Sequence, residues 1–427
     1  MTGQMRNRWL IAASAVGIHT SIGAVYAYSV LKAPLLKEVG WAFKETAWAF
    51  SIVIICMALS AAFLGRMVER IGPRKSSFLA AAFYGAGFMI AGLSVELENL
   101  YLFFLGYGVI GGIGMGIGYI SPVATLVKWF PDRRGLATGL AIMGFGFGSL
   151  VASNMLQYFM SVLNIPYTLY LIGAIYLTVM VISAQYLAPP PEGWAPKGFE
   201  AEDNKEGSSK AKQDLAQLTS IEALKTKRFY YLWVMFFITI TCGIAIISVA
   251  APLSQDVAGL GVKAAATMVG TMGLINGLGR IGWASFSDMV GRPVTYTIFF
   301  IIQAVAFMLL PQATDPWFFQ LLIFVIISCY GGVFATIPAY IGDIFGTKNL
   351  SAIHGNSLTA KAAAGLVGPQ LAAYVKDLTG SYTDTMYIFS GLFVIAIIVS
   401  IMAIININKI RKENLRESEN DYLKQMA

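Results

Sequence analysis

The chain has 427 residues, of which 57% are hydrophobic and only 12% are charged, and its formal net charge is +7. Soluble domains carry about 25% charged residues, so this composition excludes a soluble globular protein and predicts a polytopic membrane protein. Nucleic-acid binding requires a soluble basic face, which the chain lacks. The cysteines Cys56, Cys242 and Cys329 lie in apolar segments without metal-ligand spacing, so we expect neither a disulfide framework nor a metal site.

Apolar runs long enough to cross a bilayer recur along the whole chain. The first run is too long for a signal peptide and lacks a small-residue cleavage site, so we expect it to be retained. The composition and these runs predict an all-α membrane protein with twelve spans, as six plus six. The expected spans are Trp9–Leu31, Thr46–Leu64, Ser76–Ser94, Leu100–Val127, Leu136–Leu163, Tyr167–Leu187, Phe229–Pro252, Ala264–Phe286, Val294–Leu310, Trp317–Ile341, Asn356–Tyr374 and Met386–Ile407.

A polar segment separates the sixth span from the seventh. It carries seven basic and seven acidic residues and the run Pro189-Pro190-Pro191. This composition predicts a solvated linker with at most short helical pieces near Ser220–Thr226. The expected domains are an N-terminal six-helix half at residues 1–188, the linker at 189–228, a C-terminal six-helix half at 229–408 and a tail at 409–427.

Basic residues predict the orientation in the membrane. If the spans alternate sides, 23 of the 30 Lys and Arg residues fall on the side of the N-terminus and five fall on the opposite side. The positive-inside rule then places both termini and the linker in the cytoplasm, for a multi-pass protein of the plasma membrane. The two remaining cations, Arg280 and Lys361, fall inside spans.

Arg280 is the most informative residue of the sequence. It lies in the eighth apolar run, about 12 Å before the polar loop that begins at Asp288. A guanidinium does not deprotonate in proteins, and a cation at the centre of a span costs roughly 2.5–3.5 kcal/mol. We therefore expect Arg280 to face a polar cavity, where its planar fork can hold a carboxylate through two parallel hydrogen bonds. The alternative is a structural ion pair with Asp256 or Asp377.

Other side chains are candidates for the same site. Asn276, one turn before Arg280, can donate to a second carboxylate oxygen or bond another helix instead. Lys361 can attract anions or hold a gate, with helix-end snorkelling as the alternative. Tyr119 follows a glycine run that permits close helix approach, and Tyr330 is one of the aromatic residues of span ten that can line a cavity or only pack.

Two loops repeat one pattern. Gly65 is followed by Glu69 and Gly72 and then by basic residues, and the loop after span eight repeats this spacing with Asp288 and Gly291. An internal repeat of this kind predicts two parallel halves with a binding site near the midplane, where the halves meet.

This acid, glycine and base pattern resembles the conserved loop of the major facilitator superfamily, and the resemblance covers residues 9–407. Asn276-x-x-x-Arg280 resembles the Asp-x-x-x-Arg of monocarboxylate transporters. Arg280 with Lys361 resembles the cation pair of oxalate/formate exchangers, as does Tyr26-x-Tyr28-Ser29 in span one, which makes Tyr28 a further site candidate. As a whole, the chain resembles most closely the bacterial proton-coupled L-lactate transporters of the monocarboxylate family.

The resemblance implies a secondary transporter, not an enzyme, that moves a small monocarboxylate, L-lactate first, together with a proton by alternating access. The alternative is oxalate/formate-type exchange. The transporter is expected to act as a monomer in the bilayer without a cofactor, and the sequence has no GxxxxGK[ST] motif for ATP binding. A channel, the rival class, would show neither saturation nor counterflow.

Proton coupling requires a titratable side chain that carries the proton. Asn276 stands where animal monocarboxylate transporters carry a titratable aspartate, and the lysine of their span one is absent. The candidates for proton coupling are Asp256 and Asp377, at the outer ends of spans seven and eleven, and then His19 and His354, the latter in the expected loop before span eleven.

Overall fold

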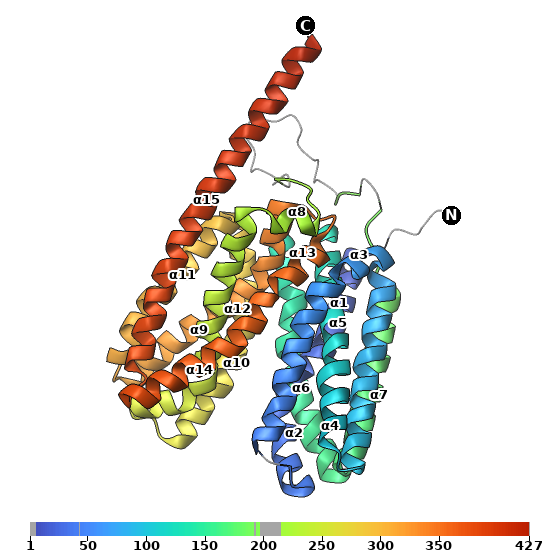
Figure 1. Ribbon diagram of the computed structural model, residues 1–427, viewed down its shortest axis with the longest axis vertical. Coiled ribbons are helices and arrows are strands. Elements are labelled where there is room, and N and C mark those ends of the chain that lie inside the picture. Colours follow the sequence, from blue (N-terminus) through green and yellow to red (C-terminus); the bar gives the residue numbers. More distant parts are fainter. Residues whose placement is uncertain (1–5, 42, 192–193, 197–214, 427) are drawn as a thin grey trace.

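The computed structural model describes residues 6–41, 43–191, 194–196 and 215–426. The described residues form α-helices with short 3-10 and π segments and contain no strand. Figure 1 shows two helical bundles that approach each other near α8 (Ser220–Leu224) and α13 (Leu350–Ser357) and diverge toward the opposite end. We call the end with α8 the linker side.

The first bundle is the N-terminal half. Its helices are α1 (Arg8–Ile22), α2 (Tyr28–Pro34), α3 (Phe43–Glu96), α4 (Leu100–Phe103), α5 (Gly111–Trp129), α6 (Arg134–Val162) and α7 (Ile165–Tyr186). A 3-10 segment (Gly23–Ala27) joins α1 to α2, and a π segment (Phe104–Ile110) joins α4 to α5. The C-terminal half contains α9 (Lys227–Ala258), α10 (Val262–Val290), α11 (Arg292–Leu309), α12 (Pro316–Phe345), α13 and α14 (Thr359–Thr379), and α15 (Thr383–Met426).

Twelve spans follow from these helices. Nine stretches of the described residues are long and apolar enough to cross a membrane, and one of them, Trp48–Glu96, holds two spans because α3 kinks at Gly72, whose φ is +80°. Helices α10 and α14 are long enough but too polar to be among the nine, and they carry Arg280 and Lys361. The predicted all-α fold of six plus six spans is confirmed.

The described end of the linker lies across the linker side. The expected short helical piece is present as α8, whose first turn is capped by Thr219 and Glu222. The backbone N–H of Leu218 donates to the carbonyl of Phe345 at 2.9 Å, and Arg66 of the N-terminal half donates to Ser220 at 2.9 Å. Residues 192–193 and 197–214 of the expected linker lie outside the described residues.

Two acidic side chains join the halves reciprocally at this end. The Asp288 carboxylate of the C-terminal half accepts from the backbone N–H groups of Gly135 and Leu136, at 3.0 and 2.9 Å, in the first turn of α6. The Glu69 carboxylate of the N-terminal half accepts from the N–H of Ser351 at 2.7 Å, in the first turn of α13. Each acid therefore satisfies open donors and the positive dipole end of a helix in the other half.

An ionic network strengthens the same contact. Asp343 of α12 lies 3.0 Å from Arg134 of the N-terminal half and 3.4 Å from Arg292, which also pairs with Asp288. Every hydrogen bond found between the halves of the described chain lies toward this end or involves Arg280 or Lys361. The halves are thus closed together on the linker side.

Replacing Asp288 by Asn tests this closure. The amide keeps the size of the carboxylate but loses its charge, and one of its two terminal atoms becomes a donor that faces a helix donor. Because a hydrogen bond to a charged group contributes about 1.5–3 kcal/mol, Asp288→Asn should raise the population open on the linker side at least about tenfold. Electron-resonance distances between spin labels at Arg74 and Met289 measure that population.

The matched control is Asp315→Asn. Asp315 caps its own helix α12 by accepting from Trp317 and Phe318, and it makes no bond to the other half. Loss of the Asp315 charge should leave the distance between the two spin labels unchanged. Equal distance distributions in Asp288→Asn and the unmodified protein would contradict the role given to the reciprocal caps.

Candidate substrate site

Arg280 is buried where the two halves meet, with only 5% of its surface exposed. Its Nη1 donates to the carbonyl of Ile142 in α6 at 2.6 Å, and its Nε donates to Oδ1 of Asn276 at 3.3 Å. Among the described residues no carboxylate lies within 4.0 Å of the guanidinium, and no hydrogen bond occupies Nη2. The cation therefore keeps donors for a ligand.

Asn276 is held beside Arg280 by the close approach of α12. A guanidinium can only donate, so the amide atom that faces it must be the oxygen, and the amide NH2 stays free to donate to a carboxylate or hydroxyl. Gly331 of α12 permits this position, because a Cβ there would lie 2.6 Å from Asn276 Oδ1 and closer still to the Asn276 carbonyl oxygen. Asn276 thus bonds within its own helix rather than to another one.

Lys361 is the second buried cation, with 3% of its surface exposed. Its Nζ lies 3.4 Å from the sulfur of Met57 and sits 5.7 and 5.5 Å from the ring centres of Phe145 and Phe334. Its charge is therefore stabilised by aromatic faces from both halves and by no carboxylate among the described residues. Because it points inward and is buried, helix-end snorkelling is excluded.

Aromatic side chains pack around the two cations. Phe145 of α6 contacts the rings of His19, Tyr26 and Tyr119 at 6.4, 5.2 and 5.9 Å between ring centres. On the C-terminal half, Tyr330 packs on Phe334 at 5.4 Å. Tyr119 and Tyr330 are both buried, with 2% and 4% of their surfaces exposed. An anion at Arg280 would therefore meet phenol rings from both halves.

Both histidines pack against the Tyr119 ring of this layer. His354 was expected in a loop, and this expectation is wrong: it lies in α13, fully buried, 5.6 Å from the Tyr119 ring of the other half. Glu69 stabilises the start of this helix by accepting from the N–H of Ser351, as described above. His19 stacks on Tyr119 at 5.4 Å and contacts its carbonyl oxygen at 3.1 Å.

The two candidate aspartates lie away from Arg280. Asp256 is half-exposed at the end of α9 and pairs with Lys376 of α14 at 2.8 Å, on the side opposite the linker. Asp377 is exposed at the same end. The alternative that either aspartate forms an ion pair with Arg280 is therefore wrong.

Tyr28 does not join the other candidates. Its ring packs on Phe50 and Tyr107 at 5.8 and 5.2 Å, inside the N-terminal half. Tyr26, two residues earlier, turns toward Phe145 instead and is 37% exposed. Sequence reasoning also did not select Phe145 or Met57, which touch Lys361. A Phe within the glycine-rich run 144–148 of α6 was the available signal.

The remaining chemistry is limited. No group of three or more His, Cys, Asp or Glu side chains among the described residues could hold a metal ion. The described cysteines are unpaired, and Cys242 and Cys329 are buried. What the site offers is a fixed positive charge, hydrogen-bond donors and aromatic walls between two halves of a membrane protein.

Two six-helix halves that meet around such a site define a membrane transporter rather than an enzyme. The chain belongs to the Major Facilitator Superfamily, whose profile matches residues 14–369. It is 27% identical over 379 residues to the oxalate:formate antiporter of Oxalobacter formigenes, covering 88% of this chain and 86% of that protein. It is 25% identical over 368 residues to mouse monocarboxylate transporter 12, covering 80% and 74%.

The fold agrees with solved structures of the superfamily. The human organic anion transporter MFSD10 superposes with a TM-score of 0.69 at 14% identity, covering 93% of this chain and all of that one. At this identity the likeness concerns the fold, which is the one described above.

Gly331→Ala tests the geometry of the site. The added methyl would overlap the Asn276 carbonyl and side chain, so α10 and α12 must separate and carry Arg280 out of position. We expect transport to fall at least about tenfold, since misplacement by 1 Å costs about a hundredfold in enzymes. The measurement is initial uptake into proteoliposomes at equal protein content. Gly282→Ala lies in α10, two residues after Arg280, but has open space at its Cβ; it is the control and should retain transport.

Proposed function

We propose that the chain carries a small carboxylate across the plasma membrane by alternating access, with L-lactate as the first candidate and a proton as co-substrate. One observation carries the proposal: Arg280 is a permanent cation buried between the halves, with free donors and no carboxylate partner among the described residues. Intramembrane cations are paired in ordinary structural roles, so the missing anion is best explained as the substrate.

The donor set suits a monocarboxylate with a 2-hydroxyl group. Arg280 Nη2 can donate to one carboxylate oxygen, and the free amide NH2 of Asn276 to the second oxygen or the hydroxyl. The rings of Tyr119, Tyr330 and Phe145 offer an apolar wall for the methyl group of lactate. The likeness to proteins named monocarboxylate transporters supports the same substrate class.

Charge also supplies the coupling between binding and movement. Arg280 bonds to Ile142 across the halves, and Lys361 lies against Met57 and Phe145 across the halves. An anion at Arg280 competes for the guanidinium and so weakens a contact that holds the linker side closed. Binding can shift the two-state equilibrium only through such a differential interaction.

A second candidate function is exchange of small anions of the oxalate and formate type. The observation that favours it is the second buried cation, Lys361, whose ammonium lies against the Phe145 ring of the other half and has no carboxylate partner among the described residues. Two uncompensated cations disfavour reorientation of the empty carrier, and a dianion can neutralise both. The likeness to the oxalate:formate antiporter supports this alternative.

Transport into proteoliposomes separates these functions. Labelled lactate, pyruvate, acetate, formate and oxalate are offered with and without a pH gradient, and with and without unlabelled anion inside. Lactate uptake that saturates and accumulates with an inward proton gradient supports symport. Strong competition by oxalate that Lys361→Ala abolishes, together with uptake only against internal anion, supports exchange. Uptake of none of these anions would reject both.

Arg280→Lys is the sharpest substitution for the proposed anchor. Lysine keeps the charge but lacks the planar fork, so it loses a parallel hydrogen bond and the contact to Ile142. Because a charged hydrogen bond contributes about 1.5–3 kcal/mol, transport efficiency should fall by about ten- to a hundredfold. Gel-filtration profile and thermal stability control for folding. Transport within twofold of the unmodified protein would rule out the fork as the anchor.

The proton is expected to act at Asp256. A proton on this carboxylate would break its pair with Lys376, which joins α9 to α14 on the side opposite the linker. Asp256→Asn should therefore preserve lactate exchange but remove accumulation driven by a pH gradient. Asp384→Asn, an acid in the first turn of α15, is the control. If Asp256→Asn still accumulates lactate, the carrier is another group, and Asp377→Asn, His19→Gln and His354→Gln are tested in the same assay.

A further inference from the structure

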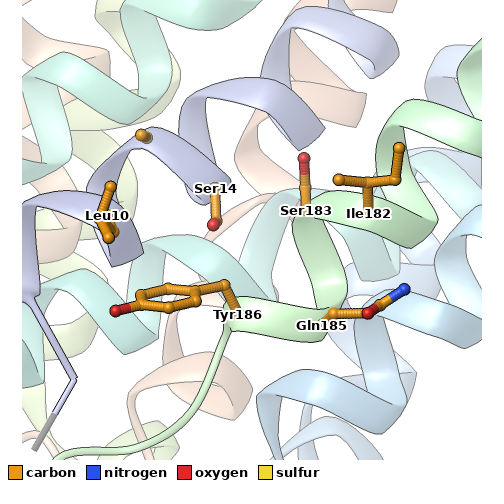
Figure 2. Close-up of a pocket in the computed structure, with 7 residues that line it drawn as sticks. Leu10, Ser14, Ile182, Ser183, Gln185 and Tyr186 are labelled. Atoms are coloured by element: carbon orange, nitrogen blue, oxygen red, sulfur yellow. The ribbon is translucent and has the colours of Figure 1, made fainter.

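A groove opens between α1 and α7 at the linker side. Its volume is about 540 Å³, and Figure 2 shows its lining residues, which come from both helices. The lining residues are Leu10, Ala13, Ser14, Ile182, Ser183, Gln185 and Tyr186. The helices touch closely at Gly17, where a Cβ would lie 2.5 Å from Ser183 Oγ, and small residues beyond this point leave the groove open.

The groove faces the lipid at the depth of the membrane interface. Leu10, Ala13, Ile182 and Gln185 are exposed, and the groove reaches about 9 Å from the start of α1, where Ser14 lies. Trp9, 46% exposed, adds an aromatic residue of the kind that lies at membrane interfaces. This surface is therefore in contact with the polar part of the lipid layer.

The polar residues of the groove lack partners. The side chains of Ser14, Ser183 and Gln185 make no hydrogen bond with any other residue that the structure describes. Hydroxyl and amide groups on a lipid-facing surface need acceptors or donors, which the glycerol esters of a phospholipid supply at this depth.

A cation without a carboxylate lies at the linker-side end of the groove. Arg6 donates from Nη1 to the carbonyl oxygens of Gln185 and Tyr186, at 3.2 and 2.5 Å, and its guanidinium lies 5.2 Å from the Tyr186 ring centre. The neighbouring Arg8 is neutralised by Asp132 at 2.8 Å. Arg6 thus holds a positive charge, with its other nitrogens unoccupied in the described structure, where a phosphate would sit.

We propose that this groove is a binding site for an anionic phospholipid. Along the groove, the cation matches the phosphate of such a lipid, the hydroxyl and amide groups match its glycerol esters, and the apolar side chains match its acyl chain. A second lipid-facing groove, between α11 and α12, has a volume of about 310 Å³ and only apolar lining residues. It has no cation and no polar group, so it offers no such match. The site does not depend on the transported substrate.

The test uses the full-length protein, delipidated in detergent and titrated with phosphatidylglycerol or phosphatidylcholine, with bound lipid counted by native mass spectrometry. Phosphatidylglycerol should bind about fivefold more tightly than phosphatidylcholine, and Arg6→Gln should remove this preference. Ala13→Leu, which fills the groove, should reduce binding of both lipids at least tenfold. Arg411→Gln, an exposed basic residue outside the groove, is the control and should bind as the unmodified protein does.

Inorganic phosphate at the same concentrations should neither bind nor raise the thermal stability, since it cannot use the apolar part of the groove. Equal binding of the two lipids, or binding that Arg6→Gln and Ala13→Leu leave unchanged, would overturn the proposal. If Ala13→Leu does not fold, the lipid preference of the unmodified protein and its loss in Arg6→Gln decide alone.

Discussion

The charge of Arg280 constrains the centre of this molecule. A guanidinium in a low-dielectric region must be solvated by something, and here it is solvated only partly, by the Ile142 carbonyl and the Asn276 amide oxygen. The contact to Ile142 requires that α6 come very close to α10, and α12 packs equally closely against Asn276. The glycines at 139 and 331 allow that approach, because a Cβ at either position would overlap the backbone of α10. The geometry of the site therefore depends on the same close helix contacts that pack the centre of the molecule.

The reciprocal caps explain why the two halves can be held together without being fused. The hydrogen bonds on the linker side come from acids placed at the first turns of helices in the other half, beside close backbone packing of α3 on α13 at Gly65 and Gly355. Such contacts are short-ranged and replaceable by water, so a small change in differential affinity can shift the equilibrium. A packed apolar interface of the same extent would resist opening. The polar contact thus suits a protein whose site must face each side in turn.

Much of the fold was predictable, because the bilayer imposes a period and a length on each span. The predicted spans fall on the observed helices, and Arg280 and Lys361 could be selected because charge is rare in such segments. The position of His354 could not be predicted, since its burial depends on a helix start that Glu69, about 280 residues away in sequence, stabilises. Contacts of this kind leave no local signal, and the same holds for Phe145 beside Lys361.

The choice between Tyr26 and Tyr28 shows a different limit. Two residues apart on a helix point to nearly opposite faces, so a motif that contains both places only one at the site. Which one depends on the exact rotation of the chain, and span one changes from α-helix to 3-10 helix at Gly23, which alters that rotation. Gly23 is also where α1 presses against the backbone of Phe145. The packing that brings Tyr26 to Phe145 thus also sets the register of span one, and a sequence pattern alone does not contain that information.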